Sequence, residues 1–69
     1  MSDVEYAIQT LPQALLRWVV AQARSRSATP EQLAAQFIPN ENDPRRAIVA
    51  RGLAQLAKLP ENRLPSSLR

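Results

Sequence analysis

The sequence has no cysteine and no histidine, and it has a single glycine among its 69 residues. Without cysteine there is no disulfide framework, and without either residue type the usual ligands of a structural zinc site are missing. The chain also has no phosphate-cradling glycine loop, no serine–histidine–aspartate set and no metal-ligand spacing. We therefore expect no metal, no cofactor and no small-molecule substrate.

Carboxylates are also few, and the six acidic residues stand mostly where helix capping and turns explain them. General acid–base catalysis needs histidine or a pair of carboxylates held together in a pocket. A chain of this length has little room for a pocket of enzymatic size. We predict that the chain is not an enzyme.

Long apolar runs are absent as well. The first residues, MSDVEYAI, are acidic and lack the basic and apolar regions of a signal peptide. No stretch approaches the roughly 20 apolar residues that a membrane-spanning helix needs. These features favour a cytoplasmic protein without a membrane partner, and the abundance of arginine and alanine is typical of a GC-rich bacterial genome.

Helix start signals and helical spacing of apolar residues predict an all-α fold, a small three- to four-helix bundle. We expect one helical domain over residues 1–60, with helices at about 3–10, 12–24, 30–38 and 44–59. Whether residues 3–24 form one kinked helix or two stays open. The last stretch, 61–69, has no periodicity and predicts an extended or disordered tail, with packing of Leu64 and Leu68 onto the bundle as the alternative.

The two central helices carry the clearest local signals. Thr29 is an N-cap and Gln32 is placed to complete a capping box. Pro39 ends that helix, because proline disfavours the α conformation in the residue before it. Asp43 then caps the next helix, with Pro44 at its first position.

In the helix over 12–24, we expect the inner side to comprise Leu11, Leu15, Trp18, Val19 and Ala23, with Leu16 at its edge. Val20 is expected on the outer side. Trp18 is predicted to be a core residue, because it is the largest apolar group in a chain with few of them. The alternatives are an interface anchor and a platform for base stacking.

In the helix over 44–59, one side is apolar and comprises Ile48, Val49, Gly52, Leu53, Leu56 and Leu59. A glycine inside a helix costs about 1 kcal/mol relative to alanine. We expect Gly52 to allow the close approach of another helix rather than to act as a hinge. Arg45 and Arg46 oppose the helix dipole in the first turn, so either a partner binds them or Glu41 and Asp43 offset their charge.

The net charge is +3, and it is unevenly distributed. The segments from Thr10 to Pro30 and from Pro44 to Pro60 contain arginine and lysine and no acidic residue. Such a distribution indicates either a basic binding face or the solvated surface of a small basic protein.

The order of these elements resembles the helix-turn-helix core of winged-helix proteins over residues 12–59. Residues Thr29 to Phe37 resemble the positioning helix, and Pro44 to Leu59 resemble the recognition helix. The resemblance implies that Val49, Leu53 and Leu56 are buried and that Arg45, Arg46 and Arg51 contact the groove or phosphates. The connection is longer and more acidic than the usual turn, no wing is evident, and the alanine-rich outer face offers little base readout.

Two functions fit the sequence best, and a helical-bundle oligomer without a ligand is a third possibility. The first is a small nucleic-acid-binding protein, such as a DNA-binding regulator or accessory factor, whose contacts come from Arg45, Arg46, Arg51, Gln55, Lys58, Arg24 and Arg26. The alternative is a protein–protein interaction module, a subunit, docking domain or phage-type modulator that binds a larger protein through its helical face. A homodimer is compatible with both functions.

Overall fold

The computed structural model describes residues 2–69, which form four α-helices and three short 3-10 helices and contain no strand. The α-helices are α1 (Asp3–Thr10), α2 (Leu16–Arg24), α3 (Pro30–Phe37) and α4 (Pro44–Lys58). The 3-10 helices are η1 (Gln13–Leu15), η2 (Glu61–Arg63) and η3 (Ser66–Leu68). The prediction of a small all-α bundle is confirmed.

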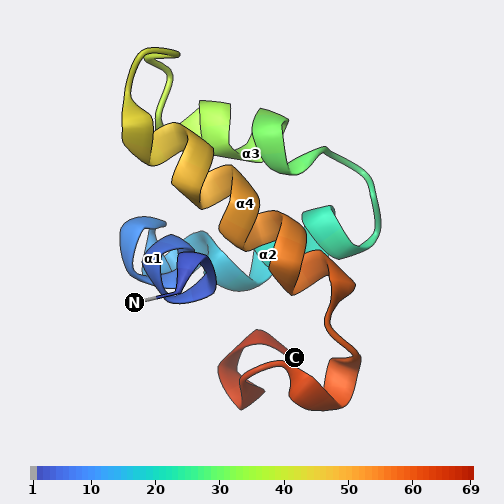
Figure 1. Cartoon of the computed structure of the whole chain (residues 1–69). Coiled ribbons are helices and arrows are strands. Elements are labelled where there is room, and N and C mark those ends of the chain that lie inside the picture. The colour runs from blue at the N-terminus through green and yellow to red at the C-terminus, as the bar shows by residue number, and fades with distance from the viewer. Residues whose placement is uncertain (1) are drawn as a thin grey trace.

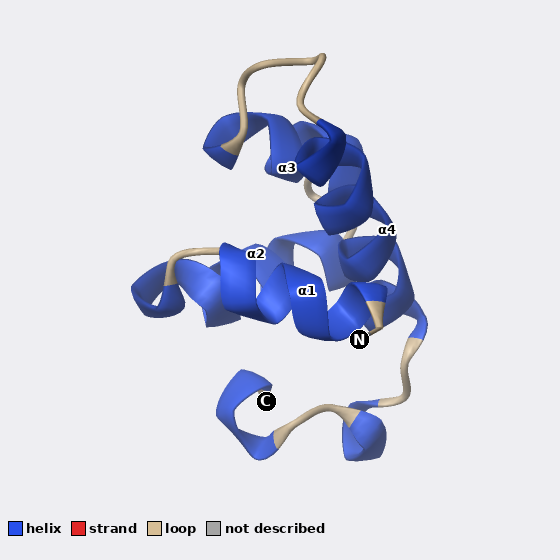
Figure 2. Cartoon of the chain, turned by 60° about the vertical axis from the view of Figure 1, so that its left-hand side comes forward, coloured by secondary structure: helices blue, strands red, loops and turns tan. Residues whose placement is uncertain are grey.

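Helix α4 is the centre of this bundle and packs against each of the other three α-helices. In Figures 1 and 2, α3 lies on one side of α4 while α1 and α2 lie on the other. The C-terminal segment lies beyond α2, on the side away from α3. The fully buried side chains Leu53 and Leu56 of α4 meet Val19 and Val20 of α2 and Leu33 of α3 in one apolar cluster.

The predicted caps are present. Thr29 and Gln32 form a reciprocal capping box, with hydrogen bonds of 3.1 and 3.0 Å between each side chain and the other residue's backbone N–H. Asp43 caps α4 by accepting a hydrogen bond from the backbone N–H of Arg45 at 3.0 Å. These bonds satisfy donors that a helix leaves unpaired at its amino end.

Residues 3–24 form two helices. Leu11 is extended between them, and Pro12 precedes the 3-10 turn η1, after which α2 begins at Leu16. The side chain of Gln13 donates to the carbonyl oxygens of Ile8 and Leu11, at 2.6 and 3.3 Å, and so holds the corner.

The predicted inner face of α2 is wrong for three residues. Trp18 and Leu15 are 48% and 44% exposed, whereas Val20, expected outside, is completely buried. The reason is that η1 has about three residues per turn, whereas an α-helix has 3.6. A face assigned by continuous α-helical spacing from Pro12 is therefore rotated relative to the face that is buried. Counted from Leu16, the buried set is Leu16, Val19, Val20 and Ala23, which is the regular spacing of a helix face.

The apolar face of α4 agrees with the expectation at Gly52. A methyl group at this position would collide with the backbone carbonyl of Asp3 and would lie 2.7 Å from Cβ of Ala7. The close approach of α1 to α4 therefore requires a residue without a side chain. This confirms the expected reason for a glycine inside the helix.

The segment 61–69 differs from an extended or disordered tail. It turns twice, in η2 and η3, and buries Leu64 and Leu68 to 3% and 7% exposure. The guanidinium of Arg69 donates to the carbonyl oxygens of Leu64 and Asn62, and Arg17 of α2 donates to the main-chain oxygen of Arg69 at 2.8 Å. Burial of the two leucines, about 1.5–3 kcal/mol each, and these hydrogen bonds both favour the folded-back segment, which is the alternative described above.

Candidate interaction surfaces

The seven residues predicted to contact nucleic acid do not form one face. Arg45 and Arg46 lie in the first turn of α4, and Lys58 ends it. Thirteen helical steps of 1.5 Å separate Arg45 from Lys58 by about 20 Å. Arg24 and Arg26 lie beside the Lys58 end, with Arg51 and Gln55 exposed between the two ends.

At the start of α4, an acid offsets one of the two arginines. Arg45 contacts both carboxylate oxygens of Asp43, with the shortest distance 2.6 Å. The side-chain hydrogen bond from Arg45 lowers the pKa of Asp43, and the backbone N–H of Arg45 lowers it further. The unfavourable position of Arg45 in the helix dipole is therefore compensated within the chain.

The surroundings of Arg46 are acidic. Its guanidinium donates to the carbonyl oxygen of Pro39 at 3.4 Å. Beside it is an open hollow of about 320 Å³, whose lining includes Glu31, Glu41 and Asp43. Asp43 is paired with Arg45, but the carboxylates of Glu31 and Glu41 would repel a phosphate backbone at this end of α4.

Arg51 is also paired within the chain. Its Nε donates to the carboxylate of Asp3 in α1 at 3.1 Å, and the arginine side chain is exposed. Exposed ion pairs of this kind contribute about 0–1 kcal/mol. An external anion could therefore replace the Asp3 carboxylate as the partner of Arg51 at little cost in stability.

Three predicted residues do come together at the other end of α4. Arg24, Arg26 and Lys58 surround a hollow of about 210 Å³ whose floor is Ala23, Pro30, Ala54 and Ala57. Arg24 has a structural role there, because its Nη1 donates to the carbonyl oxygens of Leu56 and Leu59 at the end of α4. Arg26 stands in the left-handed region, with φ of 62°.

The sequence placed Leu15 and Trp18 in the core, with an interface anchor only as an alternative for Trp18, whereas the structure exposes both on an apolar surface of η1 and α2. We call this the Trp18 face: Ala14, Leu15, Trp18 and Ala21, all exposed. Among residues 2–69, the large apolar residues with exposed side chains are Leu15 and Trp18. The signal for it was present in the sequence, since Leu16, Val19, Val20 and Ala23 alone satisfy the spacing of a buried face.

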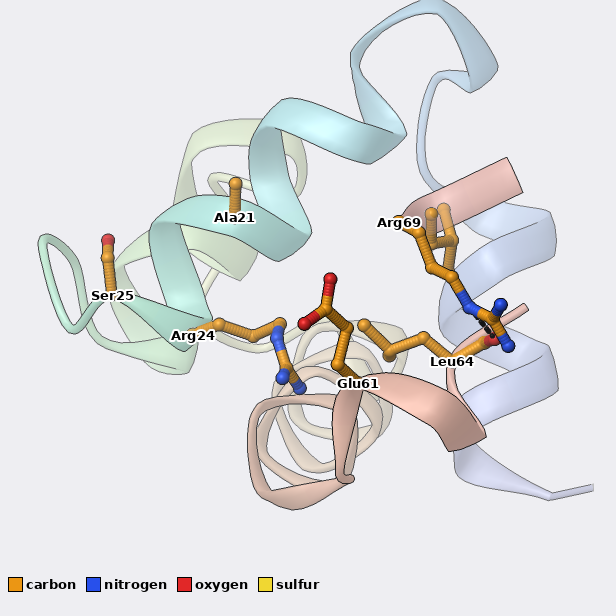
Figure 3. Close-up of a pocket in the computed structure, with 7 residues that line it drawn as sticks. Ala21, Arg24, Ser25, Glu61, Leu64 and Arg69 are labelled. Carbon is orange, nitrogen blue, oxygen red and sulfur yellow. Dashed lines mark hydrogen bonds between the residues drawn. The ribbon is translucent and has the colours of Figure 1, made fainter. Parts of the chain in front are cut away.

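Next to the Trp18 face is a cavity open to solvent, which we call the tail hollow. It measures about 420 Å³ and lies between α2 and the C-terminal segment, lined by Ala21, Arg24, Ser25, Glu61, Leu64, Leu68 and Arg69. Figure 3 shows the Glu61 side chain rising from the C-terminal segment toward α2, with Arg24 on one side and Leu64 on the other. The hollow thus combines leucine and alanine walls with two arginines and one carboxylate.

The described residues offer no group of three or more potential metal ligands. Among the same residues, no helix has the length and apolarity needed to cross a membrane. Comparison of the chain with protein-family models, with curated proteins and with solved structures found no match.

Proposed function

We propose that this chain is a protein–protein interaction module that binds a larger protein through the Trp18 face. The observation that carries the proposal is the half-exposed pair of Leu15 and Trp18, which lie three residues apart on adjoining turns. Tryptophan is among the residues that most often dominate binding energy at protein interfaces. The chain has only three aromatic residues, so leaving Trp18 exposed to water gives up much of the apolar surface that it could bury. A partner that covers Trp18 would bury this surface.

The placement of the arginines supports this function over groove reading by α4. Arg45 and Arg51 are paired with Asp43 and Asp3. The start of α4, which would enter a groove in the helix-turn-helix resemblance, is bordered by Glu31 and Glu41. A protein surface can present both positive and negative groups to this mixture of arginines and carboxylates, whereas a phosphate backbone presents negative charge alone.

The test is capture of a stoichiometric partner from a cytoplasmic extract of the native cells, followed by reconstitution of the purified pair. Trp18→Ala should weaken binding by about 2 kcal/mol or more, which is roughly thirtyfold. Gln55→Ala is the matched control, because Gln55 is exposed on α4. A partner that binds both variants equally would overturn the proposal.

Nucleic-acid binding is the second candidate. It is favoured by the cluster of Arg24, Arg26 and Lys58, whose hollow has no acid in its lining. The weak ion pair of Arg51 with Asp3 also favours it, because a phosphate could replace the Asp3 carboxylate. Exposed Trp18 would add a surface on which a base could stack. In this function the chain would be a DNA-binding accessory factor, and a dimer would double its small footprint.

A DNA titration at low and at roughly physiological salt tests this candidate. Each of Lys58→Ala and Arg51→Ala should lower affinity and reduce the salt slope by about 1 if these residues contact phosphate. Arg63→Ala serves as the control, because Arg63 is exposed on η2, outside the predicted set. Unchanged affinity in both test variants would contradict this set of contacts.

A further inference from the structure

We infer that the partner presents an acidic amphipathic segment, which covers the Trp18 face with apolar side chains and places a carboxylate in the tail hollow. This inference rests on the proposed function and names the chemistry of the partner. It follows from the continuity of the two surfaces, from their charge and from the position of Glu61.

The two surfaces are continuous along α2. Trp18, Ala21 and Ser25 are spaced at i, i+3 and i+7, so they follow one stripe of the helix. Ala21 and Ser25 also line the tail hollow. A single bound segment can therefore contact Trp18 and enter the hollow without crossing a ridge of large side chains.

The side of α2 that borders the hollow is basic. Arg17, Ala21 and Arg24 form a neighbouring stripe at i, i+4 and i+7, and Arg17 reaches across to the main-chain oxygen of Arg69. Arg24 uses Nη1 for the end of α4, while its Nε and Nη2 make no hydrogen bond with the described residues. These donors are available to a carboxylate.

Glu61 already places a carboxylate here. It is the one acid in the lining of the tail hollow, and its side chain points toward α2 beside Arg24 (Figure 3). We infer that Glu61 occupies the place of the partner's acidic side chain. Removing its charge should therefore strengthen binding, since like charges oppose each other at an interface.

The charge distribution also selects against a second copy of the chain. A two-fold dimer would bring the same surface of each copy together. Each copy would then bring Arg17, Arg24 and Arg69, against the one carboxylate of Glu61, to the shared interface. A different protein with carboxylates at the edge of an apolar stripe has the complementary pattern.

Selection from a random-peptide library against the immobilised full chain tests the inference. We expect enriched peptides to combine large apolar residues with aspartate or glutamate, and to lose binding to Trp18→Ala. Affinities of the enriched peptides are then measured by anisotropy of a label on the peptide.

Two variants with opposite expected effects make the result independent of folding. Arg17→Glu should weaken peptide binding about tenfold or more, and Glu61→Gln should strengthen it about threefold or more. Arg63→Glu is the matched control, because it changes net charge by the same amount as Arg17→Glu, whereas Arg63 lies on η2, away from the α2 stripe that carries Arg17 and outside the lining of the hollow. A damaged fold would not produce tighter binding in Glu61→Gln.

The outcomes separate the inference from the proposed function. Trp18-dependent peptides without acidic residues, or acidic peptides indifferent to Arg17 and Glu61, would overturn the inference and keep the function. Enriched peptides indifferent to Trp18, or no enrichment at all, would overturn both. Self-association that depends on Trp18 would replace the foreign partner with a second copy.

Discussion

The guanidinium of Arg24 donates a hydrogen bond to the carbonyl oxygen of Leu59 at 2.6 Å, and so joins the end of α2 to the end of α4. The same Nη1 atom donates to Leu56 at 3.0 Å. A cation at this position complements the helix dipole and adds a donor to the Leu56 carbonyl oxygen, which also accepts from the backbone N–H of Leu59.

Replacing Arg24 with alanine should therefore reduce the free energy of unfolding by about 1.5–3 kcal/mol, the range for hydrogen bonds to charged groups. Chemical denaturation measures the change. Gln55→Ala should remain within about 0.5 kcal/mol of the unmodified chain, as exposed positions do. Equal stability of both variants would mean that the Arg24 bonds do not hold α4.

Gly52→Ala should destabilise the chain although alanine is the better helix former. Helix propensity alone predicts a gain of about 1 kcal/mol. The added methyl would meet the Asp3 carbonyl and Ala7, and overpacking typically costs about 1–3 kcal/mol. Chemical denaturation measures the change in the free energy of unfolding. Ala47→Gly, at an exposed position of the same helix, is the control for helix propensity and should reduce this free energy by only about 1 kcal/mol. A more stable Gly52→Ala variant would contradict the close contact between α1 and α4.

The orientation of α2 can be tested by comparing Trp18→Ala with Leu16→Ala. Since Trp18 is half exposed and Leu16 is buried, we expect a loss of less than about 1 kcal/mol for Trp18 and of about 2–5 kcal/mol for Leu16. Thermal unfolding followed by circular dichroism measures both. The reverse order would support the core position predicted from the sequence.

Arg26→Gly should stabilise the chain. Arg26 has a left-handed backbone, and the N–H groups of Arg26 and Ser27 bond back to Ala23 and Gln22, which is the helix ending where glycine is preferred. Relief of the strain is worth about 1 kcal/mol. Ser25→Gly, at a right-handed position, should instead be neutral or destabilising in the same measurement.

Stability should depend on acid pH through Asp43. Its pKa in the folded chain lies below the unfolded value of about 3.9 because of the hydrogen bond from Arg45. The ionised carboxylate therefore stabilises the fold at neutral pH, and this contribution is lost as the pH falls through the folded pKa.

We expect the difference in unfolding free energy between the unmodified chain and Asp43→Asn to be largest near neutral pH and to shrink below about pH 4. Asparagine is a suitable replacement because it also caps helices. In an Arg45→Ala background the difference should already be small at neutral pH, as a double-mutant cycle would reveal. A pH-independent difference would contradict the pairing.

Local signals predicted much of the fold. Helix caps depend only on residues that are a few positions apart in the sequence. The caps formed by Thr29 with Gln32, and by Asp43 before Pro44, could therefore be inferred from the sequence alone. The role of Gly52 was also predictable, because it interrupts an apolar helix face. Each of these inferences needs only one helix and its period.

Contacts between distant segments were not predictable in the same way. The pairing of Arg51 with Asp3 joins residues 48 positions apart, and nothing in the sequence selects that acid. The 3-10 turn before α2 changed which residues face inward, and so moved Trp18 to the surface. The candidate site depends on the second effect, which is why six of the seven predicted arginine, lysine and glutamine positions lie outside it and only Arg24 lines the tail hollow.

The tail hollow has a further consequence for the order in which the chain matures. One wall comes from α2 and the other from residues 61–69, and Arg17 reaches a residue 52 positions later. Helices α1 to α4 pack on one another through contacts of their own, but this wall of the hollow is missing until residues 61–69 have been synthesised. A partner that needs the hollow would therefore bind only a polypeptide in which residues 61–69 have been synthesised and folded back onto α2.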